Sequence, residues 1–114
     1  MSKSYKEITQ NIKQLLMPFR KEVPAPMAAF DNMAKEAMAP GVLTALTKEL
    51  IATGIAVSTR CDGCIGFHVK GLVRLGATRE QVNEMLAVAV YLGGGPSLMY
   101  AADVLQAFEE FQVK

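Results

Sequence analysis

Apolar residues recur along this chain at spacings of three and four positions, the period of amphipathic α-helices. Prolines, glycines and helix-capping patterns divide these positions into six segments. No segment shows the sustained alternation typical of strands, and no hairpin signal joins two β-branched runs. The pattern therefore predicts an all-α fold of about six helices.

The first two predicted helices are separated by prolines. Ser4 and Glu7 form a Ser-x-x-Glu capping box that starts the first helix, and Pro18 followed by Pro24 discourages its continuation. The second helix occupies residues 27–38 and stops before a Pro-Gly step. Both segments have an apolar face, so we expect the first helix to pack against the second.

The third predicted helix, residues 42–58, is apolar around most of its circumference, which indicates a central position. Thr59 and Asp62 form a second box, Thr-x-x-Asp, which predicts that a fourth helix starts there. Glycine at position 76 marks its end.

The last two predicted helices have equally clear boundaries. Thr78 and Gln81 form a third capping box, and the helix it opens stops at the glycines of residues 93–95. These glycines lack the lysine and the preceding strand of a phosphate-binding loop, so we interpret them as a helix stop that allows close packing. Pro96 suits the first turn of the final helix.

Composition narrows the class of protein. The 114 residues are 51% apolar and 20% charged, which predicts one folded domain over residues 1–114. A formal net charge of +1 argues against nucleic-acid binding. No apolar run is long enough to span a bilayer, and the first residues are unlike a signal peptide. We therefore expect a cytoplasmic protein.

The candidate chemistry lies in the predicted fourth helix. Cys61, Cys64 and His68 stand at i, i+3 and i+7, which places them on one helix face. Helical side chains lean toward the N-terminus, so His68 reaches Cys64 more naturally than Cys61. The helix start and Arg60 favour a thiolate, so this pattern indicates redox chemistry or metal binding.

Three other interpretations compete with a reactive cysteine pair. Attachment of c-type haem requires the histidine directly after the second cysteine, which this spacing excludes. A zinc site would need Asp62 or Glu49 to complete its ligands. Inert buried cysteines with a satisfied core histidine remain an alternative. We expect neither a cofactor nor a metal.

Glu49 precedes Cys61 by twelve positions. On one straight helix the two residues would lie about 18 Å apart, so they meet only if the chain turns near residues 58–59. The capping pattern at Thr59 predicts such a turn. A carboxylate in apolar surroundings can transfer protons near neutral pH, which makes Glu49 a candidate partner for the thiol chemistry.

The spacing of the candidate residues resembles a known signature. It consists of Glu49, eleven residues, Cys61-Asp62-Gly63-Cys64, three residues and His68. This arrangement is similar to the Glu-x11-Cys-x-x-Cys-x3-His pattern of the AhpD-like alkylhydroperoxidases, within the carboxymuconolactone decarboxylase family. The resemblance extends over residues 43–108.

The resemblance implies an AhpD-like orthogonal bundle of about six helices and thiol-dependent reduction of hydroperoxides. In that family the equivalent of Cys64 attacks the peroxide, the equivalent of Cys61 resolves the sulfenic acid as a disulfide, and the equivalents of Glu49 and His68 relay protons. It also implies a thiol or lipoyl-type reductant and a homo-oligomer, trimer or hexamer. Seven methionines and the low charged fraction favour self-association as well.

Two further functions stay open at this point. Decarboxylases of the same family act on a lactone acid without a redox cysteine pair, so the pair retained here favours the redox branch. A lyase of that kind is the second hypothesis. A helical assembly module without enzymatic activity is the third.

Overall fold

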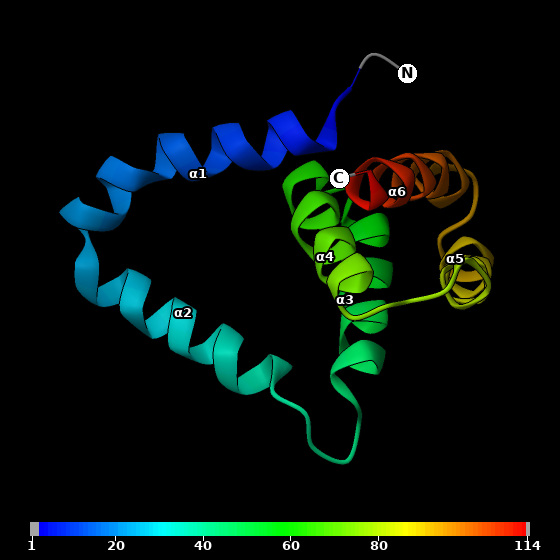
Figure 1. Ribbon diagram of the computed structural model, residues 1–114, viewed down its shortest axis with the longest axis horizontal. Coiled ribbons are helices and arrows are strands. Elements are labelled where there is room, and N and C mark those ends of the chain that lie inside the picture. Colours follow the sequence, from blue (N-terminus) through cyan, green and yellow to red (C-terminus); the bar gives the residue numbers. More distant parts are fainter. Residues whose placement is uncertain (1–2, 114) are drawn as a thin grey trace.

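Capping side chains, prolines and glycines divide residues 3–113, the part of the chain that the computed structural model describes, into six helices (Figure 1). The helices are α1 (Tyr5–Glu22), α2 (Pro24–Met38), α3 (Ala45–Thr59), α4 (Asp62–Arg74), α5 (Arg79–Gly93) and α6 (Gly95–Gln112). These residues contain no strand, and the predicted all-α class is confirmed. No helix among them is long and apolar enough to cross a membrane.

The core lies between α3, α4, α5 and α6. Figure 1 shows α5 nearly end-on beside α3, which lies in the plane of the view, so these two helices cross at a steep angle. Helix α3 contacts α2, α4, α5 and α6, which confirms its predicted central position. The fully buried apolar side chains of these four helices include Val57, Ile65, Val69, Leu72, Val82, Val104 and Phe108.

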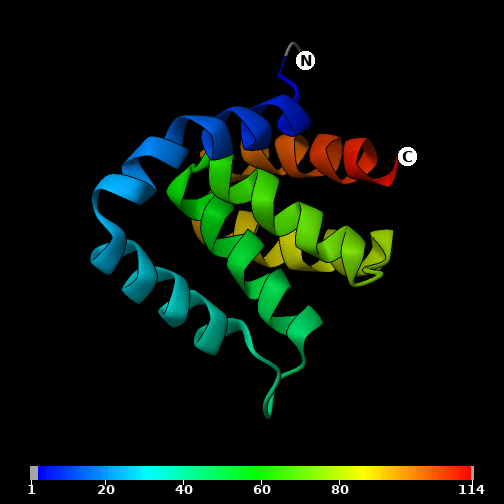
Figure 2. The same ribbon diagram turned by 60° about the vertical axis from the view of Figure 1, so that its left-hand side comes forward.

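The expectation that α1 packs against α2 is wrong. The buried residues of α1 are Tyr5 and Thr9, and this end of the helix lies against α4 and α6. Helix α1 then leaves the bundle, and α2 returns from their junction at Val23 toward the start of α3 (Figures 1 and 2). Val23 alone joins α1 and α2. Helices that pack side by side in a hairpin are usually linked by 2–5 residues, so this linker is too short for α2 to fold back along α1. No residue of α2, all of which the structure describes, is buried.

Proline at position 18 does not end α1, which continues to Glu22. A proline within a helix removes one backbone hydrogen bond, here to the carbonyl of Gln14. Gln14 is exposed, so water can satisfy that carbonyl, and the helix ends instead at Glu22, just before Pro24, the second proline expected to discourage it.

Several predicted helix ends are confirmed. Ser4 accepts the backbone N–H of Glu7 at the start of α1, and Thr78 and Gln81 form a reciprocal capping box at the start of α5. Pro96 lies in the first turn of α6, whose N-cap is Gly94, and the φ of 72° at Gly94 favours glycine. The third helix starts later than predicted, with Thr44 as its N-cap.

Candidate redox site at the start of helix α4

The turn that brings Glu49 toward the cysteines differs from the predicted one. Thr59 does not cap α4; its hydroxyl donates to the carbonyl of Ile55 (3.0 Å), and it is the last residue of α3. Arg60 then adopts a left-handed conformation (φ 57°) and closes α3. Cys61 follows as the N-cap of α4. The predicted chain turn is present, but Arg60 makes it, and a cysteine takes the place expected for the threonine.

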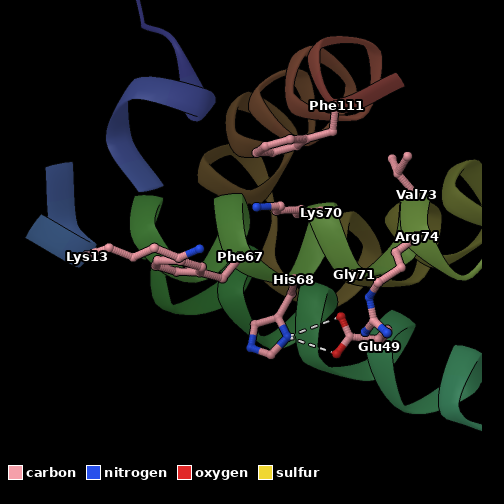
Figure 3. Close-up of a pocket in the computed structure, with 9 residues that line it drawn as sticks. All are labelled: Lys13, Glu49, Phe67, His68, Lys70, Gly71, Val73, Arg74 and Phe111. Carbon is pink, nitrogen blue, oxygen red and sulfur yellow. Dashed lines mark hydrogen bonds and ion pairs between the residues drawn. The ribbon is translucent and has the colours of Figure 1, made fainter. Parts of the chain in front are cut away.

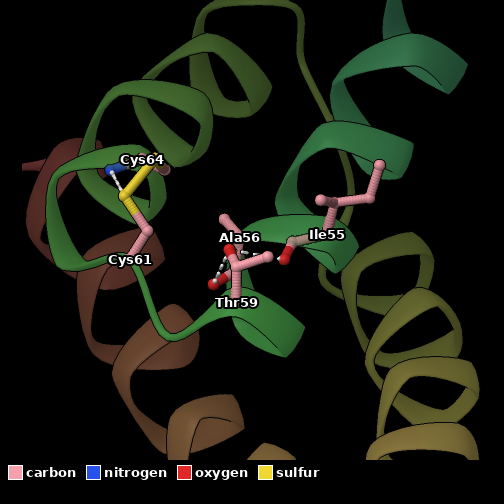
Figure 4. Close-up of a disulfide and its surroundings, with 5 residues drawn as sticks. All are labelled: Ile55, Ala56, Thr59, Cys61 and Cys64. Carbon is pink, nitrogen blue, oxygen red and sulfur yellow. Dashed lines mark hydrogen bonds between the residues drawn. A yellow bond between two sulfur atoms is a disulfide. The ribbon is translucent and has the colours of Figure 1, made fainter.

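Cys61 and Cys64 form a disulfide across the first turn of α4 (Figure 4). Their Cα atoms are 5.2 Å apart, within the usual range for disulfides. The backbone N–H of Cys64 donates to Sγ of Cys61 (3.1 Å), so a sulfur atom caps the helix. Cys61 is partly buried, whereas Cys64 is exposed. The two sulfur atoms therefore differ in access to solvent and in contact with the helix start.

Cys64 and His68 line the same cavity, between α3 and α4, of about 230 Å³. Its other lining residues are Ala52, Ile55, Ala56 and Thr59, all from α3. Cys61 does not line this cavity. A small molecule in this cavity would meet one sulfur atom and the imidazole together.

His68 contacts the carboxylate of Glu49, which α3 supplies (Figure 3). Nδ1 of His68 lies 3.3 Å from Oε1 and 3.4 Å from Oε2 of Glu49. The Glu49 side chain is 12% exposed and the His68 side chain 33%. When Nδ1 carries a proton and donates to Glu49, Nε2 is an acceptor, so the imidazole can take a proton on the side away from the carboxylate.

Gly71 makes room for this carboxylate and was not identified from the sequence. A Cβ atom at position 71 would overlap Oε2 of Glu49 and lie 2.8 Å from its Cδ. The available signal was the place of Gly71 inside a predicted helix, one turn after His68. Glycine there lowers helix stability by about 1 kcal/mol relative to alanine, so its presence indicates a packing requirement.

The structure thus brings together the four side chains whose spacing in the sequence predicts a shared site. Glu49 contacts His68, His68 shares a cavity with Cys64, and Cys64 is bonded to Cys61. Asp62, considered above as a zinc ligand, instead pairs with Lys3 (3.2 Å). Within residues 3–113, no group of three or more His, Cys, Asp or Glu side chains is arranged to hold a metal ion.

Residues 24–107 match the carboxymuconolactone decarboxylase family. The chain belongs to this family. An uncharacterised protein of Cupriavidus necator is 46% identical over 86 residues, which are 75% of this chain and 76% of that protein. An uncharacterised protein of the cox locus of Paracoccus denitrificans is 40% identical over 82 residues, 72% of this chain and 74% of its own.

Solved structures of family members show the same fold. The crystal structure of a carboxymuconolactone decarboxylase family protein from Legionella pneumophila matches with a TM-score of 0.92 and 54% identity, covering 94% of this chain and 96% of that one. A family protein of Thermotoga maritima, for which a role in an antioxidative response has been suggested, matches with a TM-score of 0.79 and 25% identity. That match covers 96% of this chain and 91% of the Thermotoga chain.

This family member has a second polar cluster on the other side of α4. The hydroxyl of Tyr5 donates to Oδ2 of Asp103 (2.7 Å), and Lys3 contacts the same oxygen (3.1 Å) and Asp62. Hydrogen bonds to Asp103 and Asp62 raise the pKa of Lys3. Burial, and then the bond to Asp103, raise the pKa of Tyr5. The cluster attaches the start of α1 to α6 and to the residue after Cys61.

Proposed function

We propose that this member of the carboxymuconolactone decarboxylase family is a thiol-dependent hydroperoxide reductase. One observation carries the proposal: the cysteine that opens into a cavity shares it with a histidine whose ring contacts a nearly buried carboxylate. A redox-active pair requires two sulfur atoms within bonding distance, and Cys61 and Cys64 meet that requirement. The suggested antioxidative role of the Thermotoga relative supports this assignment.

In the first step the thiolate of Cys64 attacks an oxygen of the hydroperoxide. The O–O bond breaks, sulfur is oxidised to a sulfenic acid, and the departing oxygen takes a proton to leave as an alcohol. His68 delivers this proton, and Glu49 holds the imidazole by its Nδ1 side. Cys64 is the attacking residue because it is exposed and lines the cavity with His68.

In the second step the thiol of Cys61 attacks the sulfenic acid of Cys64, water leaves, and the disulfide forms. A dithiol reductant, of which a lipoyl group is one kind, then attacks the accessible sulfur of Cys64. Cys61 leaves as a thiolate, and the N–H of Cys64 that contacts its sulfur stabilises the negative charge. Further exchange oxidises the reductant to its disulfide and restores both thiols.

Thiol titration tests this proposal. The reduced protein should lose both thiols after one equivalent of hydroperoxide and recover them after treatment with a dithiol. An unchanged thiol count after peroxide would contradict the proposal and leave the lyase or the assembly module. One equivalent of tightly bound zinc in the reduced protein would instead favour a metal site.

We also propose that the protein forms a homo-oligomer. The arm formed by α1 and α2 exposes large apolar side chains, including Leu15, Phe19, Phe30 and Met33. Several large apolar side chains exposed on one arm favour an interaction surface in a folded protein. Light scattering at micromolar concentration should give a mass above 12.3 kDa, and a monomer mass would contradict this proposal.

A further inference from the structure

A cavity of about 610 Å³ begins at Glu49 and His68 and extends over α4 toward α1 and α6 (Figure 3). A second hollow of about 400 Å³ shares Lys13, Lys70 and Phe111 with it. The two hollows therefore form one groove along α4, which we call the basic groove. Cavities of this size are typical of sites for small molecules.

The groove combines positive charge with an apolar wall. Its cationic side chains are Lys6, Lys13, Lys70 and Arg74, and its apolar side chains are Phe67, Val73 and Phe111. Nζ of Lys13 lies 5.8 Å from the centroid of the Phe67 ring, so charge and aromatic surface adjoin. The carboxylate in this lining, Glu49, already contacts His68.

This concentration of charge is local. The whole chain has twelve basic and eleven acidic residues, so a general excess of positive charge does not account for the groove. A small neutral peroxide would gain nothing from lysines beside aromatic rings. An anionic group on an apolar chain would contact both kinds of side chain.

The groove also extends to residues that neighbour Cys64. Phe67 and His68 follow Cys64 by three and four positions on α4, so their side chains are its neighbours on the helix surface. His68 lines both the groove and the cavity that contains Cys64. A ligand that fills the groove therefore has one end beside the histidine that serves the sulfur.

We propose that the basic groove binds an amphipathic hydroperoxide with a carboxylate head, of the fatty-acid type. The carboxylate contacts Lys13 and Lys70, the hydrocarbon chain lies along Phe67 and Phe111, and the hydroperoxide group lies at the His68 end. This inference rests on the proposed peroxidase function and names its substrate class. The carboxylate takes no part in the redox step: the O–O bond breaks, Cys64 is oxidised, and the product is the hydroxy acid.

The kinetic test compares linoleic acid hydroperoxide with its methyl ester, in which an uncharged ester replaces the carboxylate, at concentrations below micelle formation. In single-turnover oxidation of the reduced cysteines, the double variant Lys13→Gln/Lys70→Gln should react with the acid about tenfold more slowly than the wild type, as expected when electrostatic attraction to a site is removed. Its rate with the ester should be unchanged. The matched control, Lys21→Gln/Lys35→Gln, changes exposed lysines of α1 and α2 outside the groove and should behave as the wild type with both substrates.

A binding measurement separates failure of this inference from failure of the proposed function. Calorimetry with linoleate, which has no peroxide group, should detect binding to the oxidised wild type and at least about tenfold weaker binding to Lys13→Gln/Lys70→Gln. If neither peroxide oxidises the cysteines, the proposed function fails and the substrate assignment fails with it, whatever linoleate does. If both peroxides oxidise the wild type at equal rates, or linoleate does not bind, the function stands and the anionic substrate class is overturned.

Discussion

Two nearly buried carboxylates flank α4, and their surroundings differ. Asp103, from α6, accepts a short hydrogen bond from Tyr5 (2.7 Å) and pairs with Lys3 (3.1 Å). Glu49, from α3, has longer contacts of 3.3 and 3.4 Å with His68 and lines a cavity. Their side chains are almost equally covered, 8% exposed for Asp103 and 12% for Glu49.

Burial alone therefore does not tell these carboxylates apart. Hydrogen bonds from two donors fix the Asp103 side chain and connect the start of α1 to α6, which is a structural role. The Glu49 carboxylate faces a histidine and open space, where a proton can enter and leave. Changes at Glu49 should then alter the chemistry, and changes around Asp103 should alter stability.

The largest effect is expected for Glu49→Gln. The amide keeps the shape of the side chain but lacks the negative charge that holds the His68 imidazole, so peroxide reduction should slow by about 10²-fold to 10⁴-fold. The urea midpoint should change little. Glu84→Gln on the exposed face of α5 is the matched control. A variant with normal peroxidase rates and a lowered midpoint would show that Glu49 is structural, like Asp103.

The second-largest effect is expected for Gly71→Ala. The added methyl group overlaps the Glu49 carboxylate, which must move away from His68, and a displacement of this kind costs up to about 10²-fold in rate. Gly54→Ala is the control, because a Cβ atom there lies 3.7 Å from Sδ of Met85, an ordinary contact. Steady-state kinetics should also show that Gly71→Ala has no further effect when combined with Glu49→Gln. Additive losses would mean that Gly71 acts by another route.

A smaller effect, on stability, is expected for Tyr5→Phe. The variant removes a hydrogen bond to a buried carboxylate, which costs about 1–3 kcal/mol in the free energy of unfolding. The rate of cysteine oxidation should stay the same. Urea denaturation checks the first expectation, with Tyr91→Phe at an exposed position as the control. A Tyr5→Phe variant with wild-type stability and slower oxidation would contradict the structural role.

The smallest effect concerns Glu110, which accepts the backbone N–H of Tyr5 (2.9 Å) at the start of α1. Partial burial alone would raise its pKa, but hydrogen bonds from Gln106, Lys6, Tyr5 and Ser4 outweigh burial and lower the pKa below the ordinary 4.5. A lowered pKa in the folded state stabilises the protein above pH 4.5, and this contribution is lost as the pH falls through the folded value.

Glu110→Gln should therefore reduce the acid sensitivity of unfolding, by less than about 1 kcal/mol because solvent screens this partly exposed group. Urea denaturation between about pH 3 and pH 6 measures this pH dependence of the free energy of unfolding. Carboxyl groups titrate in roughly this range. Glu36→Gln, exposed on α2, should keep the wild-type profile. An identical pH dependence in Glu110→Gln and wild type would exclude this role for Glu110.

Local signals predicted most of the helices and the cluster of site residues. The Thr78 and Gln81 box depends only on neighbours three positions apart, and so does the shared face of Cys61 and Cys64. Glu49 and His68 can meet only because the chain turns between α3 and α4. The sequence predicted this turn at residues 58–59, and the structure has it at Arg60.

The remaining features depend on packing between distant segments. An apolar face on α1 shows that the helix has a partner but does not identify which, so its contact with α4 and α6 could not be predicted. Thr59 suits an N-cap better than Cys61, but the left-handed turn at Arg60 ends α3 after Thr59 and leaves Cys61 at the N-cap of α4. The space that Gly71 leaves for Glu49 is defined only once α3 lies on α4.

The assignment of Cys64 as the residue that attacks peroxide is the centre of the account. Mass spectrometry after a single addition of hydroperoxide to the reduced Cys61→Ser and Cys64→Ser variants tests it directly. Cys61→Ser should accumulate a sulfenic acid at Cys64, and Cys64→Ser should lose the fast reaction, because the remaining thiol does not share the His68 cavity. A sulfenic acid at Cys61 in Cys64→Ser, with Cys64 inert in Cys61→Ser, would contradict the assignment.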